Sequence, residues 1–312
     1  MACNQVCIFT HPSCLEHDPG AGHPERIDRL LSVLETLRSP QWQTTLRWID
    51  APAASDEQLC LAHDRAYVER VLAAIPQQGL VSLDPDTVIG PRSAVAARHA
   101  AGAVCAAVDA VLGGDCQRAF CAVRPPGHHA ERDRAMGFCL FGNSAIGALH
   151  AIARHGLERV AIMDFDVHHG NGTENIVQGR SDVLYVSTHQ HPLYPGTGSG
   201  PVPGSDNIVN VPLPAATGSD AFRERFAEAV VPAIDAFAPQ LLLISAGFDA
   251  DQRDPLAGLS LAAEDFGWAT RALVDIADRH AEGRVVSVLE GGYDLDALVD
   301  ATTAHVRALA GQ

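Results

Sequence analysis

Short apolar runs alternate along the chain with longer amphipathic segments. Seven runs rich in β-branched residues predict strands, at Val6–Thr10, Ala119–Val123, Val160–Phe165, Val183–Thr188, Ile208–Val211, Leu241–Ser245 and Val285–Leu289. Several of them, such as LLLIS at 241–245, are apolar on both faces. That pattern is typical of parallel strands that helices cover on both sides.

The segments between these runs predict helices. Apolar residues recur at helical spacing in six of them, at Glu25–Arg38, Glu57–Ile75, Ser93–Leu112, Asp220–Phe237, Glu264–His280 and Leu295–Leu309. The alternation predicts an α/β fold with a parallel, doubly wound sheet. An eight-stranded closed barrel ranks second, because the alternation is irregular between Val183 and Val211. No linker or repeat divides the chain, so a single domain over residues 1–312 is expected.

Composition narrows the classes of protein that remain. Hydrophobic residues make up 47% of the 312 residues and charged residues 19%, which favours a substantial core over disorder. The net charge of −16 argues against a nucleic-acid partner and favours cationic ones. The eight cysteines form no C-x-x-C pair, so we expect mostly buried thiols. We expect a cytoplasmic protein without a membrane partner, because no signal peptide or bilayer-length apolar run is evident.

Polar segments follow four of the predicted strands directly. They are RPPGHHA at 124–130, DFDVHHGNGT at 164–173, AGFDADQRDP at 246–255 and EGGYDL at 290–295. In open α/β sheets, ligands bind beyond the carboxyl ends of the strands. The four segments are therefore expected to converge on one pocket.

The second segment predicts a metal site. Asp164, Asp166 and His168 lie at alternate positions of an extended stretch, so their side chains project to the same side. Burying two carboxylates and an imidazole there is costly unless a cation compensates them. Hydrolytic zinc sites use three N and O ligands and leave one position open. Asp166 and His168 can supply two of these ligands.

A third ligand is expected from another strand end. Asp249 lies at the matching place, and Asp251 and Asp254 compete with it on spacing alone. An Asp/His/Asp set suits zinc or iron(II). The alternative, in which Asp164 and Asp166 only cap a helix or pair with arginines, does not account for two carboxylates in line with a histidine.

The first and fourth segments predict acid–base and oxyanion chemistry. His128 and His129 follow two prolines, which hold them on a stiff corner that suits general acid–base work. Asp164 and Asn171 are candidates to orient them. Tyr293 could donate a hydrogen bond to an oxyanion, although a tyrosine after a Gly-Gly turn is more often a packing residue.

Together these motifs resemble those of the histone deacetylase superfamily. HDPGAGHPERIDRL (17–30), GFCLFGN (137–143) and PGTG (195–198) join the four segments above, and the likeness spans residues 10–295. It points to a class II-like bacterial deacetylase or an acetylpolyamine amidohydrolase relative. The resemblance implies an arginase-like α/β fold with a central eight-stranded parallel sheet.

The resemblance also implies roles for individual residues. Zinc, or else iron(II), would be bound by Asp166, His168 and Asp249. The catalytic group would comprise His129 as general base and then general acid, His128 as its electrostatic partner held by Asp164, Asn171, and Tyr293 as the group that polarises the carbonyl. The substrate channel would be lined by Gly137, Phe138, Tyr194 and Leu256. A structural potassium ion would be held by Asp164, Asp166, His168 and Ser187.

Four further positions refine the resemblance. Asn171 after HHG resembles class II enzymes, whereas class I enzymes carry aspartate. Leu256 stands where polyamine-selective relatives carry glutamate, which favours acyl-lysine substrates. Arg26 matches a basic residue near the pocket floor, and Asp86 matches a rim residue that holds the substrate backbone.

The reaction implied is removal of acetyl or related acyl groups from lysine side chains of proteins or peptides. The nearest alternative is the same chemistry on small acetylated amines such as acetylpolyamines. A binuclear manganese ureohydrolase would need a further metal-binding histidine and aspartate, and a silent reader of acylated ligands would not need an acid–base pair. The sequence carries no signal for the oligomeric state.

Overall fold

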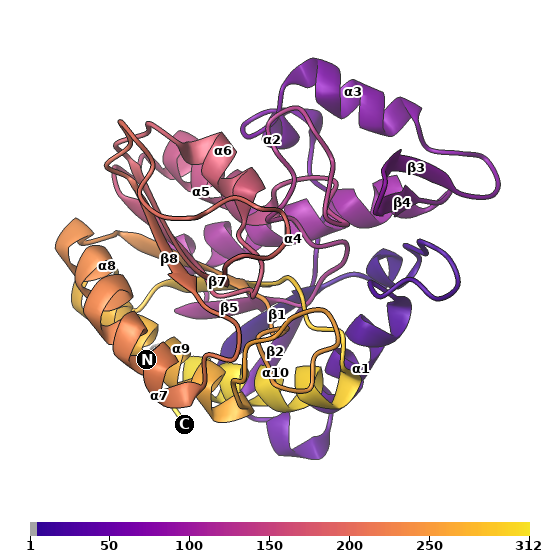
Figure 1. Cartoon of the computed structure of the whole chain (residues 1–312). Coiled ribbons are helices and arrows are strands. Elements are labelled where there is room, and N and C mark those ends of the chain that lie inside the picture. Colours follow the sequence, from indigo (N-terminus) through magenta and orange to yellow (C-terminus); the bar gives the residue numbers. More distant parts are fainter. Residues whose placement is uncertain (1–4) are drawn as a thin grey trace.

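A computed structural model describes residues 5–312 and contains one large, open parallel sheet (Figure 1). Its eight strands are hydrogen-bonded in the order β2-β1-β5-β10-β9-β6-β7-β8, and all adjacent pairs are parallel. The strands are β1 (Val6–Thr10), β2 (Leu46–Asp50), β5 (Arg118–Cys121), β6 (Val160–Asp164), β7 (Val183–Gln190), β8 (Ile208–Leu213), β9 (Leu241–Ala246) and β10 (Val285–Leu289). The parallel α/β prediction is confirmed. The rival closed barrel is wrong, because β2 and β8 form two free edges.

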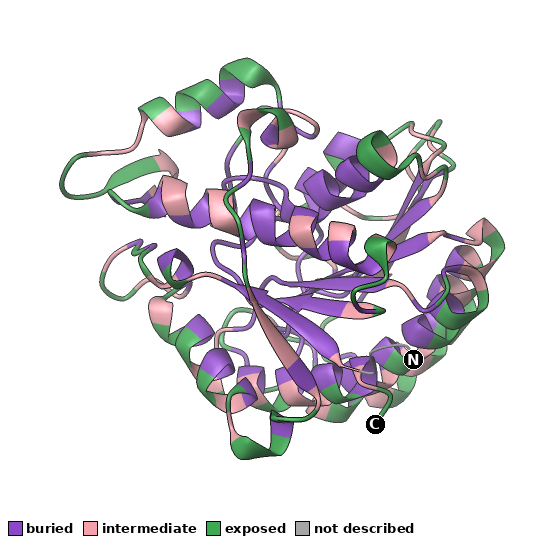
Figure 2. Cartoon of the chain, turned by 180° about the vertical axis from the view of Figure 1, so that it is seen from behind, coloured by how far each residue is buried: buried purple, intermediate pink, exposed green. Residues whose placement is uncertain are grey.

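Helices cover both faces of this sheet (Figures 1 and 2). The α-helices are α1 (Ile27–Leu37), α2 (Asp56–Leu59), α3 (Arg65–Ala73), α4 (Ser93–Gly113), α5 (Asn143–His155), α6 (Asn171–Val177), α7 (Ser219–Arg225), α8 (Val231–Phe237), α9 (Ala263–His280) and α10 (Leu295–Leu309). Two short 3-10 helices, η1 (Pro12–Leu15) and η2 (Pro40–Trp42), and a π-turn, η3 (Phe226–Val230), complete the set. Helices α4 and α5 pack on one face, and α1, α9 and α10 pack together on the other.

Helix α4 lies in the core. By length and composition alone it could cross a membrane, but 67% of its apolar window is buried inside the protein. It packs against α5 and against strands β1, β5 and β10. Its alanine-rich sequence permits this close packing, since small side chains let a helix approach the sheet and its neighbours closely.

The sequence missed the elements with the weakest patterns. Strand β2 is an edge strand whose sequence LRWID is mostly half-exposed, so it lacks an apolar run. Helix α5 is buried over most of its length, and its sequence NSAIGALHAIARH therefore lacks a clear polar face. Helix α6 has only seven residues and begins inside the predicted functional segment.

The helix predicted over 57–75 is two helices, α2 and α3, and long-range contacts explain the break. The imidazole of His63 lies between them, with Nδ1 2.9 Å from the carbonyl oxygen of Glu131 and Nε2 accepting the N–H of Gly142 at 2.8 Å. The N–H of Asp64 donates to the carbonyl of Arg132 at 3.0 Å. The unwound segment thus holds the loop that follows the histidine pair, a constraint that no local pattern shows.

A small antiparallel hairpin, β3 (Val81–Asp84) and β4 (Thr87–Ile89), lies outside the main sheet. Its turn supports the loop at 137–138. The carboxylate of Asp86 accepts the N–H of Gly137 at 3.0 Å, and the hydroxyl of Thr87 accepts the N–H of Phe138 at 3.0 Å. Phe138 has φ +69°, a left-handed conformation that a bulky residue adopts only when its surroundings impose it. The hairpin supplies those restraints.

Seven of the eight cysteines lie within the described residues, and all seven are free thiols. Six of them are buried, which agrees with the prediction. Cys3 lies outside the described residues.

Candidate functional site

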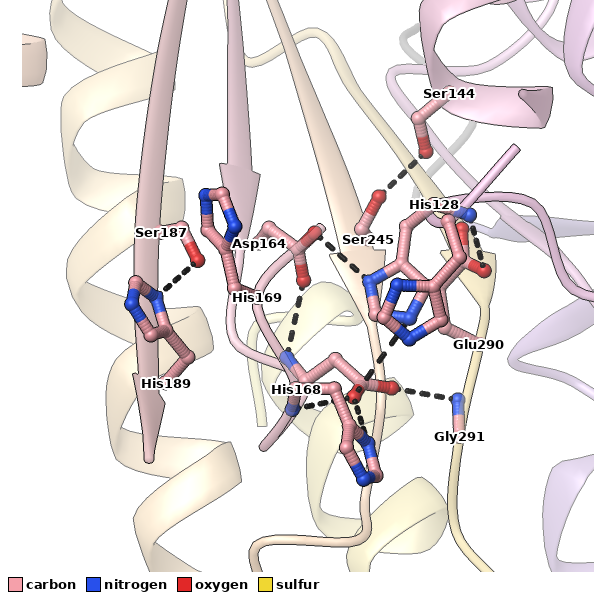
Figure 3. Close-up of polar contacts among 12 residues, drawn as sticks. His128, Ser144, Asp164, His168, His169, Ser187, His189, Ser245, Glu290 and Gly291 are labelled. Carbon is pink, nitrogen blue, oxygen red and sulfur yellow. Dashed lines mark hydrogen bonds and ion pairs between the residues drawn. The ribbon is translucent and has the colours of Figure 1, made fainter. Parts of the chain in front are cut away.

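The four polar segments meet at one edge of the sheet. They follow β5, β6, β9 and β10, which lie side by side in the order β5-β10-β9-β6. Because all four strands are parallel, their carboxyl ends point the same way and deliver the segments to one place (Figure 3). The expected convergence is present.

Three of the delivered side chains form a compact, buried group. The ligand atoms of Asp166, His168 and Asp249 all lie within 4.8 Å of one another. Nδ1 of His168 lies 3.1 Å from Oδ1 of Asp166 and 3.2 Å from Oδ2 of Asp249. Burial and the charge of Asp166 both raise the pKa of Asp249. Two carboxylates this close can both stay ionised at low cost only if a positive charge lies between them.

The backbone approaches the two carboxylates closely, and two glycines make this approach possible. Gly247 and Gly291 lie against Asp166 and Asp249, and a Cβ atom at either glycine would overlap a carboxylate oxygen. The N–H of Gly291 donates to Oδ2 of Asp166 at 2.8 Å, which fixes that carboxylate (Figure 3). The N and O donor set, the compactness and the close backbone fit a divalent transition metal.

The other two aspartates near Asp249 have different contacts. Asp251 pairs with the guanidinium of Arg253, at 2.9 Å between Oδ1 and Nε. Asp254 accepts backbone N–H groups, including that of Tyr293 at 2.7 Å. The structure thus brings Asp249, among the three spaced candidates, to Asp166 and His168.

The tandem histidines lie beside this group, and each has its own partner. Nδ1 of His128 lies 3.1 Å from Oδ2 of Asp164 (Figure 3), whereas Nδ1 of His129 lies 2.8 Å from Oδ1 of Asn171. The ring of His129 is 5.9 Å from that of His168. A carboxylate thus orients one histidine and a neutral amide orients the other.

These partners separate the two imidazoles electrostatically. Burial disfavours the charged form of His128, but the charges of Asp166 and Asp164 outweigh it and hold its pKa well above the usual value. Burial, together with the charge of His128, holds the pKa of His129 well below the usual value. His129 is therefore neutral and able to accept a proton, and His128 is the positively charged neighbour.

Tyr293 is held from its backbone and from its ring. Its N–H donates to Asp254, and the guanidinium of Arg29 lies 4.8 Å from its ring centroid. Burial raises the pKa of Tyr293 well above the usual value, so the phenol keeps its proton and can donate a hydrogen bond. The ring of Phe138 meets it edge to face at 6.0 Å.

A narrow cavity of about 220 Å³ leads from the surface to this group. It is lined by Asp86, His129, Gly137, Phe138, His168, Tyr194, Leu256 and Tyr293. All four residues expected in the channel line it. Tyr194 and Leu256 are 37% and 36% exposed, which places them at the mouth.

The basic residue at the floor of the site is not the expected one. The side chain of Arg26 is 50% exposed and pairs with Asp28, so that expectation is wrong. Arg29 is fully buried instead, and its guanidinium donates to the carbonyl oxygens of Gly292 and Glu290, both at 2.5 Å. Arg29 lies on the buried face of α1, one helical turn beyond Arg26.

Glu290 is a site residue that sequence reasoning missed. Its Oε2 accepts the N–H of Gly127 at 2.6 Å and of His128 at 3.2 Å, and so anchors the backbone of the histidine pair (Figure 3). Oε1 has no hydrogen-bond partner within residues 5–312. Burial raises the pKa of Glu290 to about 7. The signal available was its place immediately before the two glycines.

Ser187, expected near a potassium ion, lies on β7 opposite Asp164 of β6 in the strand register. Its hydroxyl is 2.8 Å from Nδ1 of His189 (Figure 3). Oδ2 of Asp164 also accepts the hydroxyl of Tyr185 at 3.1 Å, a contact that the sequence did not indicate. The carboxylate of Asp164 is thus held by His128 through one side-chain contact and by Tyr185 through another.

Comparison with known proteins agrees with this arrangement. Residues 23–309 match the family model of the histone deacetylase domain. The chain is 45% identical to a histone deacetylase-like amidohydrolase of Pseudomonas aeruginosa over 88% of this chain and 73% of that protein. It is 36% identical to a probable deacetylase of Archaeoglobus fulgidus over 97% of this chain and 86% of that protein.

A solved structure extends the comparison to the fold. The crystal structure of the HDA15 HD domain superposes with a TM-score of 0.92 and 34% identity, over 99% of this chain and 89% of that one. Such similarity places the protein among the hydrolytic deacetylases with the arginase/deacetylase fold. Within that class, the chain belongs to the histone deacetylase family.

Proposed function

We propose that the protein is a zinc-dependent amidohydrolase that removes acetyl or related acyl groups from lysine side chains of proteins or peptides. The observation that carries the proposal is the meeting of Asp166, His168 and Asp249 beside a neutral His129 at the end of a narrow cavity. A cavity of about 220 Å³ with aromatic walls suits a straight aliphatic stem such as that of lysine.

The metal site would activate the carbonyl and the water, while His129 and Tyr293 handle the proton transfers and the oxyanion. Zinc held by Asp166, His168 and Asp249 would polarise the acyl carbonyl and lower the pKa of water toward neutrality. Nε2 of His129 takes the proton of the attacking water, because Nδ1 is engaged with Asn171. The phenol of Tyr293 donates to the oxyanion, and His129 then protonates the leaving amine.

The neighbouring residues keep this machinery in place. Asp164 and Glu290 orient His128 through its ring and its backbone, and the positive charge of His128 keeps His129 neutral. The carbonyl oxygen of Gly137 would accept the substrate amide N–H at the channel wall. We further propose that a structural potassium ion is held near Asp164 and Ser187, with Asp166 and His168 contributing.

The same proposal extends to the organisation of the chain. It treats residues 1–312 as one catalytic domain, which the family match over 23–309 supports. It also places the enzyme in the cytoplasm, and the seven free thiols support a reducing compartment.

An activity panel tests the function. We expect the purified enzyme to release acetate from acetyl-lysine peptides, to lose this activity on treatment with a chelator, and to regain it when Zn²⁺ is added back. Restoration of activity by Fe²⁺ but not by Zn²⁺ would identify iron(II) as the catalytic metal. Higher kcat/KM on acetylspermidine than on every acyl-lysine peptide would instead favour the small-amine alternative, and no amide hydrolysis on any substrate would refute the proposal.

Leu256 provides a test of substrate choice. Leu256→Glu places a negative charge at the mouth of the channel, where it can attract the free amines of an acetylpolyamine. A partly exposed ion pair contributes about 1 kcal/mol, so kcat/KM for acetylspermidine is expected to rise about fivefold. Leu256→Gln keeps the size without the charge and serves as the control. An equal rise in both variants would show that charge at this position does not select the amine.

A further inference from the structure

A second cluster of metal-ligating side chains lies away from the site just described. Asp109 of α4 faces His150 and His155 of α5. Nε2 of His150 lies 2.9 Å, and Nε2 of His155 2.6 Å, from the same Oδ1 atom of Asp109. All three donor atoms lie within 4.8 Å of one another, and this is the second of two such groups within residues 5–312. We propose that Asp109, His150 and His155 bind a second divalent transition-metal ion that links α4 to α5.

The cluster is independent of the catalytic site. Helix α5 begins beside the histidine-pair loop, where the side chain of Asn143 donates to the carbonyl of Pro125 at 3.2 Å. His155 lies at the other end of the helix, twelve residues later, which corresponds to about 18 Å along its axis. An ion there would fasten the two helices that cover one face of the sheet, without contacting the substrate.

Rigid elements hold the three donors. Asp109 lies in the last turns of α4, and His150 and His155 lie in the last turns of α5. Both helices end at glycines in the left-handed conformation, Gly114 and Gly156, so the donors sit on complete helical turns and not on a loop. Sites built on helices keep ligand positions more precisely than sites on loops.

The cluster is open to solvent on one side. The side chain of His150 is 6% exposed, that of His155 26% and that of Asp109 42%. Asp109 and His150 line a surface hollow of about 700 Å³, which Glu57 of α2 also lines. An ion can therefore enter from solvent, with water completing its coordination.

The donor chemistry favours a transition metal over calcium or magnesium. Two imidazole nitrogens and one carboxylate oxygen suit Zn²⁺, Co²⁺, Ni²⁺ or Cu²⁺, whereas the hard cations prefer oxygen alone. Partial burial raises the pKa of Asp109, but hydrogen bonds with His155 and His150 outweigh that effect and lower it. The carboxylate is therefore ionised, as a metal ligand must be.

Arg154 competes for the same carboxylate. Its Nε lies 3.6 Å from Oδ1 of Asp109, while its side chain is 67% exposed and can move into solvent. Removing Arg154 therefore distinguishes a metal-binding site from a cluster that is held together by ion pairs alone. Removing Arg154 would weaken a cluster held by ion pairs, but it would strengthen metal binding, since the guanidinium repels a cation.

Metal counting tests the proposal without relying on enzyme activity. Enzyme whose catalytic site is filled with one equivalent of Zn²⁺ is titrated with Co²⁺, and bound ions are counted after equilibrium dialysis. We expect wild type to bind one additional ion. His155→Ala should weaken that binding at least about 100-fold, more than the loss of an outer-shell partner. Arg154→Ala, the matched control on the same helix turn, should bind the additional ion more tightly than wild type.

Several outcomes would overturn the proposal. They are no additional ion in wild type, equal binding by wild type and His155→Ala, or equal weakening in both variants. A Co²⁺-dependent rise in Tm in wild type that is absent in His155→Ala would support it. The counts remain informative even if the chain hydrolyses no amide, so this proposal and the proposed function can fail separately.

Discussion

Tyr293→Phe is expected to lower kcat for deacetylation by roughly 100- to 1000-fold, the usual effect of removing one oxyanion donor. Burial keeps the phenol protonated, so it is available as a donor throughout the neutral pH range. Phenylalanine keeps the ring that contacts Phe138 and the guanidinium of Arg29. The loss is therefore expected in catalysis alone.

Steady-state kinetics with an acetyl-lysine peptide measures this effect. Metal content and the unfolding midpoint in urea are the controls, and both should match wild type, because Asp254 holds the backbone N–H of residue 293 and not its hydroxyl. Turnover near the wild-type rate in a folded, metal-loaded Tyr293→Phe protein would remove Tyr293 from the mechanism.

Glu25→Ala is expected to lower the free energy of unfolding by about 3–5 kcal/mol, because it leaves buried cations without their partner. Glu25 is fully buried and binds two arginines that are also fully buried. Its Oε1 lies 3.0 Å from Nη1 of Arg29, and its Oε2 accepts Nη2 of Arg124 at 2.7 Å. His17 adds a contact at 3.5 Å.

Urea denaturation of wild type and variant measures the difference. Glu16→Ala is the matched control, because Glu16 forms an ion pair with Arg92 in which both side chains are about half exposed. Exposed pairs contribute at most about 1 kcal/mol, so this control should differ little from wild type. A Glu25→Ala protein no less stable than the control would show that the buried arginines find other compensation.

The strands and the metal group were the most predictable parts of the protein. Val6–Thr10 and Val285–Leu289 are strands with the predicted bounds, because strands buried on both faces read as nearly continuous apolar runs. The segment from Asp164 to His168 was visible because polar side chains in an apolar run are costly and rarely accidental. Spacing in the sequence could not by itself identify Asp249 as the third metal ligand, because Asp251 and Asp254 were equally compatible with it.

The missed residues act through contacts that are remote in sequence. Arg29 and Leu31 both lie in α1, yet Leu31 is 40% exposed and Arg29 is fully buried. The reason is Glu25, one turn earlier, together with carbonyl groups more than 260 residues away. Glu290 likewise binds backbone N–H groups about 160 residues away. Periodicity cannot identify such partners.

The hairpin of β3 and β4 has a consequence for how specificity can evolve. Phe138 forms the channel wall, but Asp86 and Thr87 on a separate surface turn impose its conformation. Lengthening or shortening that turn would widen or tilt the entrance while leaving the hydrolytic residues untouched. New acyl preferences could thus arise through insertions in a peripheral loop, at little risk to the reaction itself.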